Sequence, residues 1–173
     1  MPSIEIAKQV IALKPDAIGL YCWLEKEKGA NFITIEVARQ IAALAAEQSI
    51  ETFYLTYGLT VEEVVRDCSA IGNTHVQLLG DIPTSELVKL KTMLPALQTV
   101  KVIGVTGPES VEEALAYAHS DAVDQILLDS RSGAVRGGTG KTHDWSVSRQ
   151  IAEASPKPVW LAGGSGCITL RRP

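Results

Sequence analysis

Six short apolar runs that alternate with amphipathic stretches are the feature of this sequence that most constrains its fold. Most of the runs are almost uniformly apolar, which is typical of strands covered on both faces and therefore of a parallel sheet. Their starts recur at roughly 25 to 33 residues, about the repeat of a βα barrel or a doubly wound sheet. The predicted strands span residues 17–23, 51–57, 75–79, 100–105, 125–129 and 158–162.

The stretches between these runs carry signals for the start of a helix. Thr60 with Glu63, and Ser110 with Glu113, match the capping box, in which the hydroxyl accepts a backbone N–H and the glutamate reaches back. Thr34 precedes a stretch whose apolar residues recur at helical spacing. We therefore expect helices to begin near Thr34, Thr60 and Ser110. Further helices are predicted over residues 4–13, 85–93 and 146–154.

Composition narrows the class of protein. The 173 residues are 46% hydrophobic, which is ordinary for a folded globular domain and too apolar for a disordered chain. With 16 Lys+Arg against 20 Asp+Glu, the net charge is −4, so no basic surface is expected for nucleic acid or an anionic membrane. No stretch approaches the roughly 18 apolar residues that a membrane-spanning helix needs.

Cysteine use and the first residues indicate where the chain works. Cys22, Cys68 and Cys167 are odd in number and widely spaced, which fits neither a disulfide framework nor a paired metal site. We expect them to be small buried apolar residues with reduced thiols. The start, MPSIEIAKQV, has neither the charged nor the apolar region of a secretory signal. The predicted location is therefore cytoplasmic.

Candidate site residues follow the predicted strands, because parallel α/β folds bind ligands at the carboxyl ends of their strands. Asp129 closes one run, where a carboxyl group beside an apolar wall can act as a general acid; a helix cap or an ion pair is an equal alternative. Gly163 and Gly164 end another run and suit either a phosphate held by backbone N–H groups or a tight turn. The histidines share no metal-ligand spacing and suggest no Ser/His/Asp arrangement, so no metal site is predicted.

A glycine-rich segment, GGTGKT, follows Asp129 in the sequence. It is not a Walker A loop, because Val135 occupies the place of the required first glycine, and it lacks the spacing of a dinucleotide fingerprint. The backbone of such a segment could approach an anion, with Lys141 nearby, or the segment could be a flexible connection. Its glycines are Gly137, Gly138 and Gly140.

The string LLDSRSGAVRGGTGKTHDW followed by PVWLAGG resembles the phosphoribosylanthranilate isomerase family, in which similar positions read LLD, GGTGKTFDW and LAGG. DAIGLYCW, THVQLLGD and TVKVIGV resemble the second, fourth and fifth strands of that family. The resemblance covers nearly the whole chain and implies an α/β fold, a parallel (β/α)8 TIM barrel. Residues 1–173 would then form a single, truncated barrel domain of about six strands, without the first and the eighth.

The resemblance also implies a reaction. Members of the family carry out an Amadori rearrangement in tryptophan biosynthesis, opening the ribose of phosphoribosylanthranilate and moving a proton to give a ketone, with neither metal nor organic cofactor. Asp129 matches the general acid that protonates the ribose ring oxygen. The matches to the phosphate site are Gly163 and Gly164, and those to the loop over the substrate are Gly137, Gly138 and Gly140.

Four departures from the family pattern accompany the resemblance. The general base of the family is a cysteine in a K-I-C-G string that has no match in this chain, and Cys22 is not at its position. An S-P-R string whose arginine holds the anthranilate carboxylate is replaced by EKEKGAN, where Lys26 or Lys28 could substitute in charge but not in shape. Leu79 stands where the family usually has histidine. The S-S-G phosphate loop of the eighth strand has no match.

Three hypotheses follow from these observations. The first is a phosphoribosylanthranilate isomerase that takes a small phosphorylated sugar as substrate. The second is a non-catalytic or substrate-shifted paralogue that binds a sugar phosphate, and the third is an isomerase of another sugar phosphate. Open strand edges in an incomplete barrel also predict a homodimer.

Overall fold

The computed structural model describes residues 2–22, 32–132, 135–136 and 143–163. It divides into two compact units, residues 1–99 and 100–173, which are described separately. The assignment of 1–173 to one domain therefore stays a prediction. The residues of interest outside the described ranges are Lys26, Lys28, Gly137, Gly138, Gly140, Lys141, Gly164 and Cys167.

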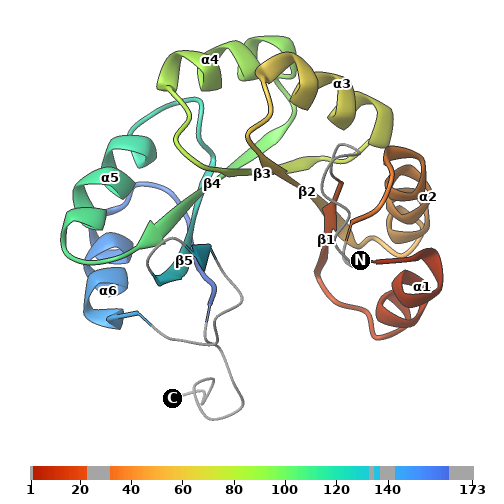
Figure 1. The fold of residues 1–173 in the computed structure, drawn as a ribbon, viewed down its shortest axis with the longest axis horizontal. Coiled ribbons are helices and arrows are strands. Elements are labelled where there is room, and N and C mark those ends of the chain that lie inside the picture. The colour runs from red at the N-terminus through yellow and green to blue at the C-terminus, as the bar shows by residue number, and fades with distance from the viewer. Residues whose placement is uncertain (1, 23–31, 133–134, 137–142, 164–173) are drawn as a thin grey trace. The chain divides into compact units, whose positions relative to one another are not determined.

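The first unit is a series of helices and parallel strands (Figure 1). Its elements are α1 (Ile4–Ala12), β1 (Ala17–Tyr21), α2 (Ile35–Ala46), β2 (Glu51–Tyr57), α3 (Val61–Ile71), β3 (His75–Leu79) and α4 (Thr84–Met93). β2 lies between β1 and β3 and pairs in parallel with both. The prediction of a parallel sheet is therefore confirmed in this unit.

Burial in this unit follows the pleat of the strands. In β1 the buried residues are Ile18 and Leu20, whereas Gly19 and Tyr21 on the other face are partly exposed. The helices lie along one side of the strands (Figure 1). The apolar runs had predicted strands covered on both faces. In the described residues of this unit, helices bury one face, and the second face stays partly exposed.

The second unit repeats the pattern from the strand that begins at its boundary. Its elements are β4 (Gln98–Val105), α5 (Glu109–Ala118), β5 (Gln125–Ser132), β6 (Val135–Arg136), α6 (Trp145–Ala154) and β7 (Val159–Leu161). β5 pairs in parallel with β4 and with β7, and β6 folds back antiparallel onto the end of β5. The short strand β6 was not predicted. No helix in the described part of the chain is both long and apolar enough to cross a membrane.

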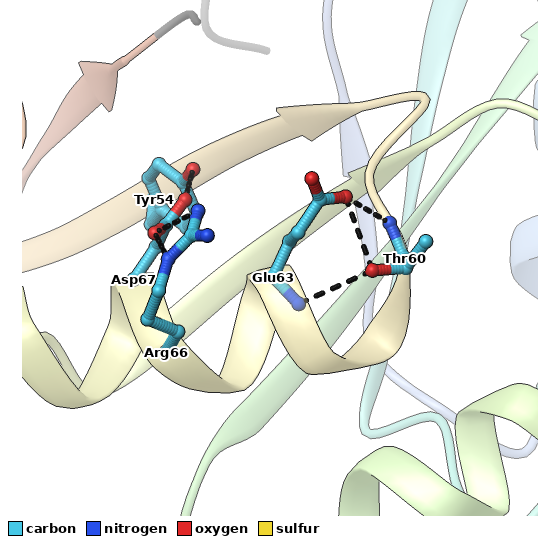
Figure 2. Close-up of polar contacts among 5 residues, drawn as sticks. All are labelled: Tyr54, Thr60, Glu63, Arg66 and Asp67. Carbon is cyan, nitrogen blue, oxygen red and sulfur yellow. Dashed lines mark hydrogen bonds and ion pairs between the residues drawn. The ribbon is translucent and has the colours of Figure 1, made fainter.

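Two of the predicted helix starts have the expected caps. The Thr60 hydroxyl accepts the Glu63 N–H at 3.3 Å, and the Glu63 carboxylate accepts the Thr60 N–H at 2.8 Å, which completes the capping box of α3 (Figure 2). The Thr34 hydroxyl accepts the Val37 N–H at 3.2 Å and caps α2. Each bond satisfies a backbone donor that the first turn of a helix leaves without a partner.

The capping box predicted at Ser110 is wrong. α5 begins at Glu109 and is preceded by Pro108, whose backbone is already helical at φ −58° and ψ −27°. Proline favours this position because its φ is preset and it has no N–H to satisfy. Ser110 therefore lies inside the helix, buried, and its hydroxyl accepts the Thr106 N–H at 3.1 Å instead.

A buried polar contact ties α3 to β2 on the side that the helices cover. The Tyr54 hydroxyl donates to the Asp67 carboxylate at 2.7 Å, and Arg66 donates to the other oxygen of that carboxylate at 2.8 Å (Figure 2). Burial, with the negative charge of Asp67, raises the pKa of Tyr54. The phenol therefore stays protonated and remains the donor.

Removing the Thr60 hydroxyl tests the cap of α3. We expect Thr60→Ala to lower the free energy of unfolding by about 1 kcal/mol, because the bond from the Glu63 N–H to the Thr60 hydroxyl is lost, whereas the bond donated by the backbone N–H of residue 60 remains. The matched control is Thr84→Ala: Thr84 begins α4 but is exposed and makes no capping bond. Urea denaturation of the two variants measures the difference, and equal losses would contradict the assignment.

Candidate active site

Asp129 lies on β5, four residues from its start, on the partly exposed face of the strand. The neighbouring residues Leu128 and Ser130 are buried on the opposite face, and Asp129 itself is half-buried. On the adjacent strand β4 the residue paired with Asp129 is Gly104, which has no side chain to cover the carboxyl group. The strand pattern therefore presents a carboxyl group near the carboxyl end of a parallel strand, where ligands bind in this class of fold.

Gly163 lies against the Asp129 carboxyl group. It follows β7, and the ladder continues to its preceding residue, since the Ala162 N–H donates to the Leu128 carbonyl at 2.7 Å. A Cβ atom at Gly163 would lie 2.6 Å from Asp129 Oδ1 and 2.7 Å from the Ser130 nitrogen, and its φ is +83°. Both the contact and the backbone angle require glycine. The structure thus brings together two of the predicted site residues.

His143 is a third member of this group of residues, and sequence reasoning did not identify it. Its Nδ1 lies 2.8 Å from the Ser130 hydroxyl, and its Nε2 is hydrogen-bonded to the Ser148 hydroxyl on α6. Burial lowers the pKa of His143, although the negative charges of Asp129 and Asp144 oppose that effect. A lowered pKa keeps the ring neutral at pH 7.

No sequence signal marks this histidine, because the contacts that define it depend on the fold. Its partners are 13 residues before and five residues after it in the chain, and they lie on different elements. Neither separation is a recognised motif spacing. Only the pairing of strands and the packing of α6 place these side chains together.

Two residues that depart from the family pattern have clear positions in the first unit. Leu79 ends β3 and is partly exposed, and its apolar side chain cannot transfer a proton. Cys22 is buried just after β1, where its backbone forms an isolated parallel β-bridge with Ile33. Burial, with a contribution from Asp67, raises the pKa of the Cys22 thiol to about 12. Cys22 therefore has the character of a core residue and not of a base.

The buried-cysteine prediction holds for both cysteines in the described residues. Cys68 on α3 is 3% exposed and Cys22 is 8% exposed, and both are free thiols. Burial also raises the pKa of Cys68 to about 12. Thiolates, not thiols, act as nucleophiles and bases, so neither side chain is suited to catalysis at neutral pH.

Parallel strands joined by helices, with a carboxyl group near the carboxyl end of one strand, place this chain in the class of parallel α/β folds that bind ligands at their strand ends. Comparison with solved structures identifies the barrel type within this class. Phosphoribosyl anthranilate isomerase from Thermus thermophilus superposes with a TM-score of 0.76 at 21% identity, covering 96% of this chain and 74% of that one. An isomerase solved with reduced 1-(o-carboxyphenylamino)-1-deoxyribulose 5-phosphate gives 0.72 at 22% identity, covering 95% and 73%. The predicted TIM-barrel type of fold is confirmed.

Sequence comparison shows the family. The family model described as N-(5'-phosphoribosyl)anthranilate (PRA) isomerase matches residues 6–167. The N-(5'-phosphoribosyl)anthranilate isomerase of Methanocella arvoryzae is 36% identical over 149 residues, which are 86% of this chain and 67% of that protein. This chain belongs to the N-(5'-phosphoribosyl)anthranilate isomerase family, whose members are isomerases of tryptophan biosynthesis. It spans about two thirds to three quarters of the length of these relatives.

A pair of glycine substitutions tests the contact at Asp129. Gly163→Ala should destabilise the protein both through its positive φ and through overlap with Asp129 and Ser130. Gly72→Ala is the matched control, because Gly72 has φ +78° but nothing within 4 Å of a Cβ atom. We expect about 1 to 2 kcal/mol for Gly72→Ala and about 1 to 3 kcal/mol more for Gly163→Ala in urea denaturation. Similar losses would show that the space beside Asp129 is open.

Thiol titration tests the burial of Cys22 and Cys68. In a Cys167→Ser variant, which leaves these two thiols, we expect no reaction with a disulfide reagent at pH 8 over minutes. Raising the pKa from 9.0 to about 12 lowers the thiolate fraction about a thousandfold, and burial blocks the reagent as well. Both thiols should react in guanidinium chloride. Rapid reaction of one thiol in the native protein would contradict its assignment to the core.

Proposed function

We propose that this chain isomerises N-(5'-phosphoribosyl)anthranilate with Asp129 as its general acid. The observation that carries the proposal is the contact between the half-buried Asp129 carboxyl group and Gly163, near the carboxyl ends of β5 and β7, in a chain of this family. A carboxyl group in this place can deliver a proton to a ligand bound over the strand ends.

The chemistry begins at the oxygen of the ribose ring. Asp129 donates a proton to that oxygen, the bond from it to C1 breaks, and the nitrogen lone pair forms a C1=N bond. Removal of the proton from C2 then gives an enolamine, which becomes the ketone when C1 takes up a proton and the C2 hydroxyl loses one. Cys22 and Cys68 do not supply the base for the second step, since both are buried with a pKa of about 12.

The phosphate of the substrate is proposed to bind at backbone N–H groups after β7. The support is the place of Gly163 just after β7, at the carboxyl ends of the strands, where ligands bind in this class of fold. Gly164 would extend this site. The glycines proposed to lie over the substrate, by resemblance, are Gly137, Gly138 and Gly140.

The proposed substrate is a small phosphorylated sugar compound, and the proposed location of the chain is the cytoplasm.

Two copies of the chain are proposed to pair through strand edges. β7 pairs only with β5 in the described part of the chain, and its Trp160 and Leu161 are each 48% exposed.

A second candidate function, isomerisation of a different sugar phosphate, is favoured by one observation. Leu79 ends β3 with an apolar side chain at a position where the family usually has a histidine, so this position offers a ligand no hydrogen bond from its side chain. The gain or loss of a single hydrogen bond to a substrate typically changes substrate preference more than it changes the fold.

Asp129→Asn tests the general acid. The amide cannot donate a carboxyl proton, so we expect turnover of phosphoribosylanthranilate to fall about 10²-fold to 10⁴-fold with the fold unchanged. The matched control is Asp121→Asn, an exposed carboxylate before the amino end of β5, which should leave turnover unaltered. Fluorescence of the substrate follows the reaction, and growth of a tryptophan auxotroph supports it. Full activity in Asp129→Asn would contradict the assignment of Asp129 as general acid. A wild-type protein that turns over other sugar phosphates but not phosphoribosylanthranilate would favour the second candidate function.

A further inference from the structure

The hydrogen-bonded bridge Ser130–His143–Ser148 joins the strand of the active site to the helix behind it. Ser130 is on β5 and Ser148 is on α6, and both are buried, at 5% and 8% exposed. His143 lies between them, with one ring nitrogen on each hydroxyl. A serine hydroxyl can donate or accept, so a neutral imidazole satisfies both contacts in either tautomer.

The first contact of this bridge reaches the residue next to the proposed general acid. Ser130 directly follows Asp129, and its nitrogen and hydroxyl both lie 2.7 Å from the Cβ position of Gly163. Asp129 Oδ1 lies 2.6 Å from the same position. A shift of the Ser130 peptide would therefore move the Asp129 carboxyl group and its contact with Gly163 together.

The second contact supplies a fixed support. Ser148 lies inside α6, which begins at Trp145 after the Asp144 cap, whose carboxylate accepts the Ser146 N–H at 2.9 Å. His143 immediately precedes this cap, so its backbone is held close to the start of the helix. Burial lowers the pKa of His143, which favours the neutral ring.

The bridge distinguishes this chain from the family string quoted above. That string reads GGTGKTFDW, and this chain reads GGTGKTHDW. Phenylalanine could fill the space but could not bond either hydroxyl. Without the imidazole the hydroxyls of two buried serines would each lose a hydrogen-bond partner, which is unfavourable.

We propose that His143 is a positioning residue, which holds the Asp129 carboxyl group at the carboxyl end of β5 through its bond to Ser130. Its effect on turnover rests on the proposed function; its effect on the geometry of Asp129 does not. Of the two bonds, the one to Ser130 acts on the site, and the one to Ser148 serves as the anchor.

Two substitutions of His143 separate these bonds. In His143→Asn the side-chain amide takes the place of Nδ1 and keeps the contact with Ser130. In His143→Gln the amide takes the place of Nε2 and keeps the contact with Ser148. Both variants lose the ring and one hydrogen bond, so a general loss of packing affects them alike. Their thermal unfolding midpoints should therefore fall by similar amounts.

The first readout is structural and needs no activity. In NMR spectra of the unliganded protein, the carboxyl carbon of Asp129 and the amides of Ser130 and Gly163 should shift further in His143→Gln than in His143→Asn. Ring-current changes are common to both variants and cancel in the comparison. Equal shifts in the two variants would overturn the proposal. If His143→Gln does not fold, Ser130→Ala against Ser148→Ala makes the same comparison.

The second readout is kinetic. We expect His143→Gln and Ser130→Ala to lower kcat about 10-fold to 100-fold with KM within about twofold, because a misplaced acid affects the chemical step more than binding. His143→Asn should recover kcat to within about threefold of the wild type. Equal kcat values in the Asn and Gln variants would overturn the proposal. Absence of turnover in the wild type would count against the proposed function, and the NMR comparison would still decide the role of His143.

Discussion

The parallel pairing of β5 with β4 and β7 is the constraint on which the candidate site depends. It sets Gly104 opposite Asp129 on one side and carries the chain past Leu161 to Gly163 on the other. The 2.6 Å approach of the Asp129 oxygen to the Cβ position of Gly163 follows from that register. A slip of one residue would turn Asp129 toward the helices and bury an unpaired carboxyl group, which is strongly unfavourable.

The helices hold that register from the other face of the strands. Ile126 and Leu128 of β5 are almost completely buried, as are Val147 and Ile151 of α6. Burial of such side chains contributes about 1.5 to 3 kcal/mol each, which is more than a surface contact supplies. Polar groups on this face are bonded to one another, as with Tyr54 and Asp67 in the first unit and Ser130 with His143 in the second. The same packing therefore supports the fold and the immediate surroundings of Asp129.

Prediction succeeded where the signal is local. The caps at Thr34 and Thr60 depend on residues three apart, and the strands depend on continuous apolar runs, so both could be recognised from the sequence. The cap at Ser110 failed because Pro108 starts its helix earlier, a competing local signal of greater weight. β6 has two residues and no apolar run, and no pattern could predict it. The prediction that Asp129 is a site residue came from its position at the end of an apolar run and from the resemblance to the isomerase family.

The sequence by itself determined the order of strands and helices, the parallel class of sheet and the family, because apolar periodicity and the LLD and LAGG strings are properties of neighbouring residues. It also placed Asp129 and Gly163 near the carboxyl ends of strands, although β5 continues past Asp129 to Ser132. Only the tertiary structure decided that these two residues touch and that His143 joins Ser130 to Ser148. These are contacts between residues distant in the chain, and they exist only once the strands have paired and the helices have packed against them.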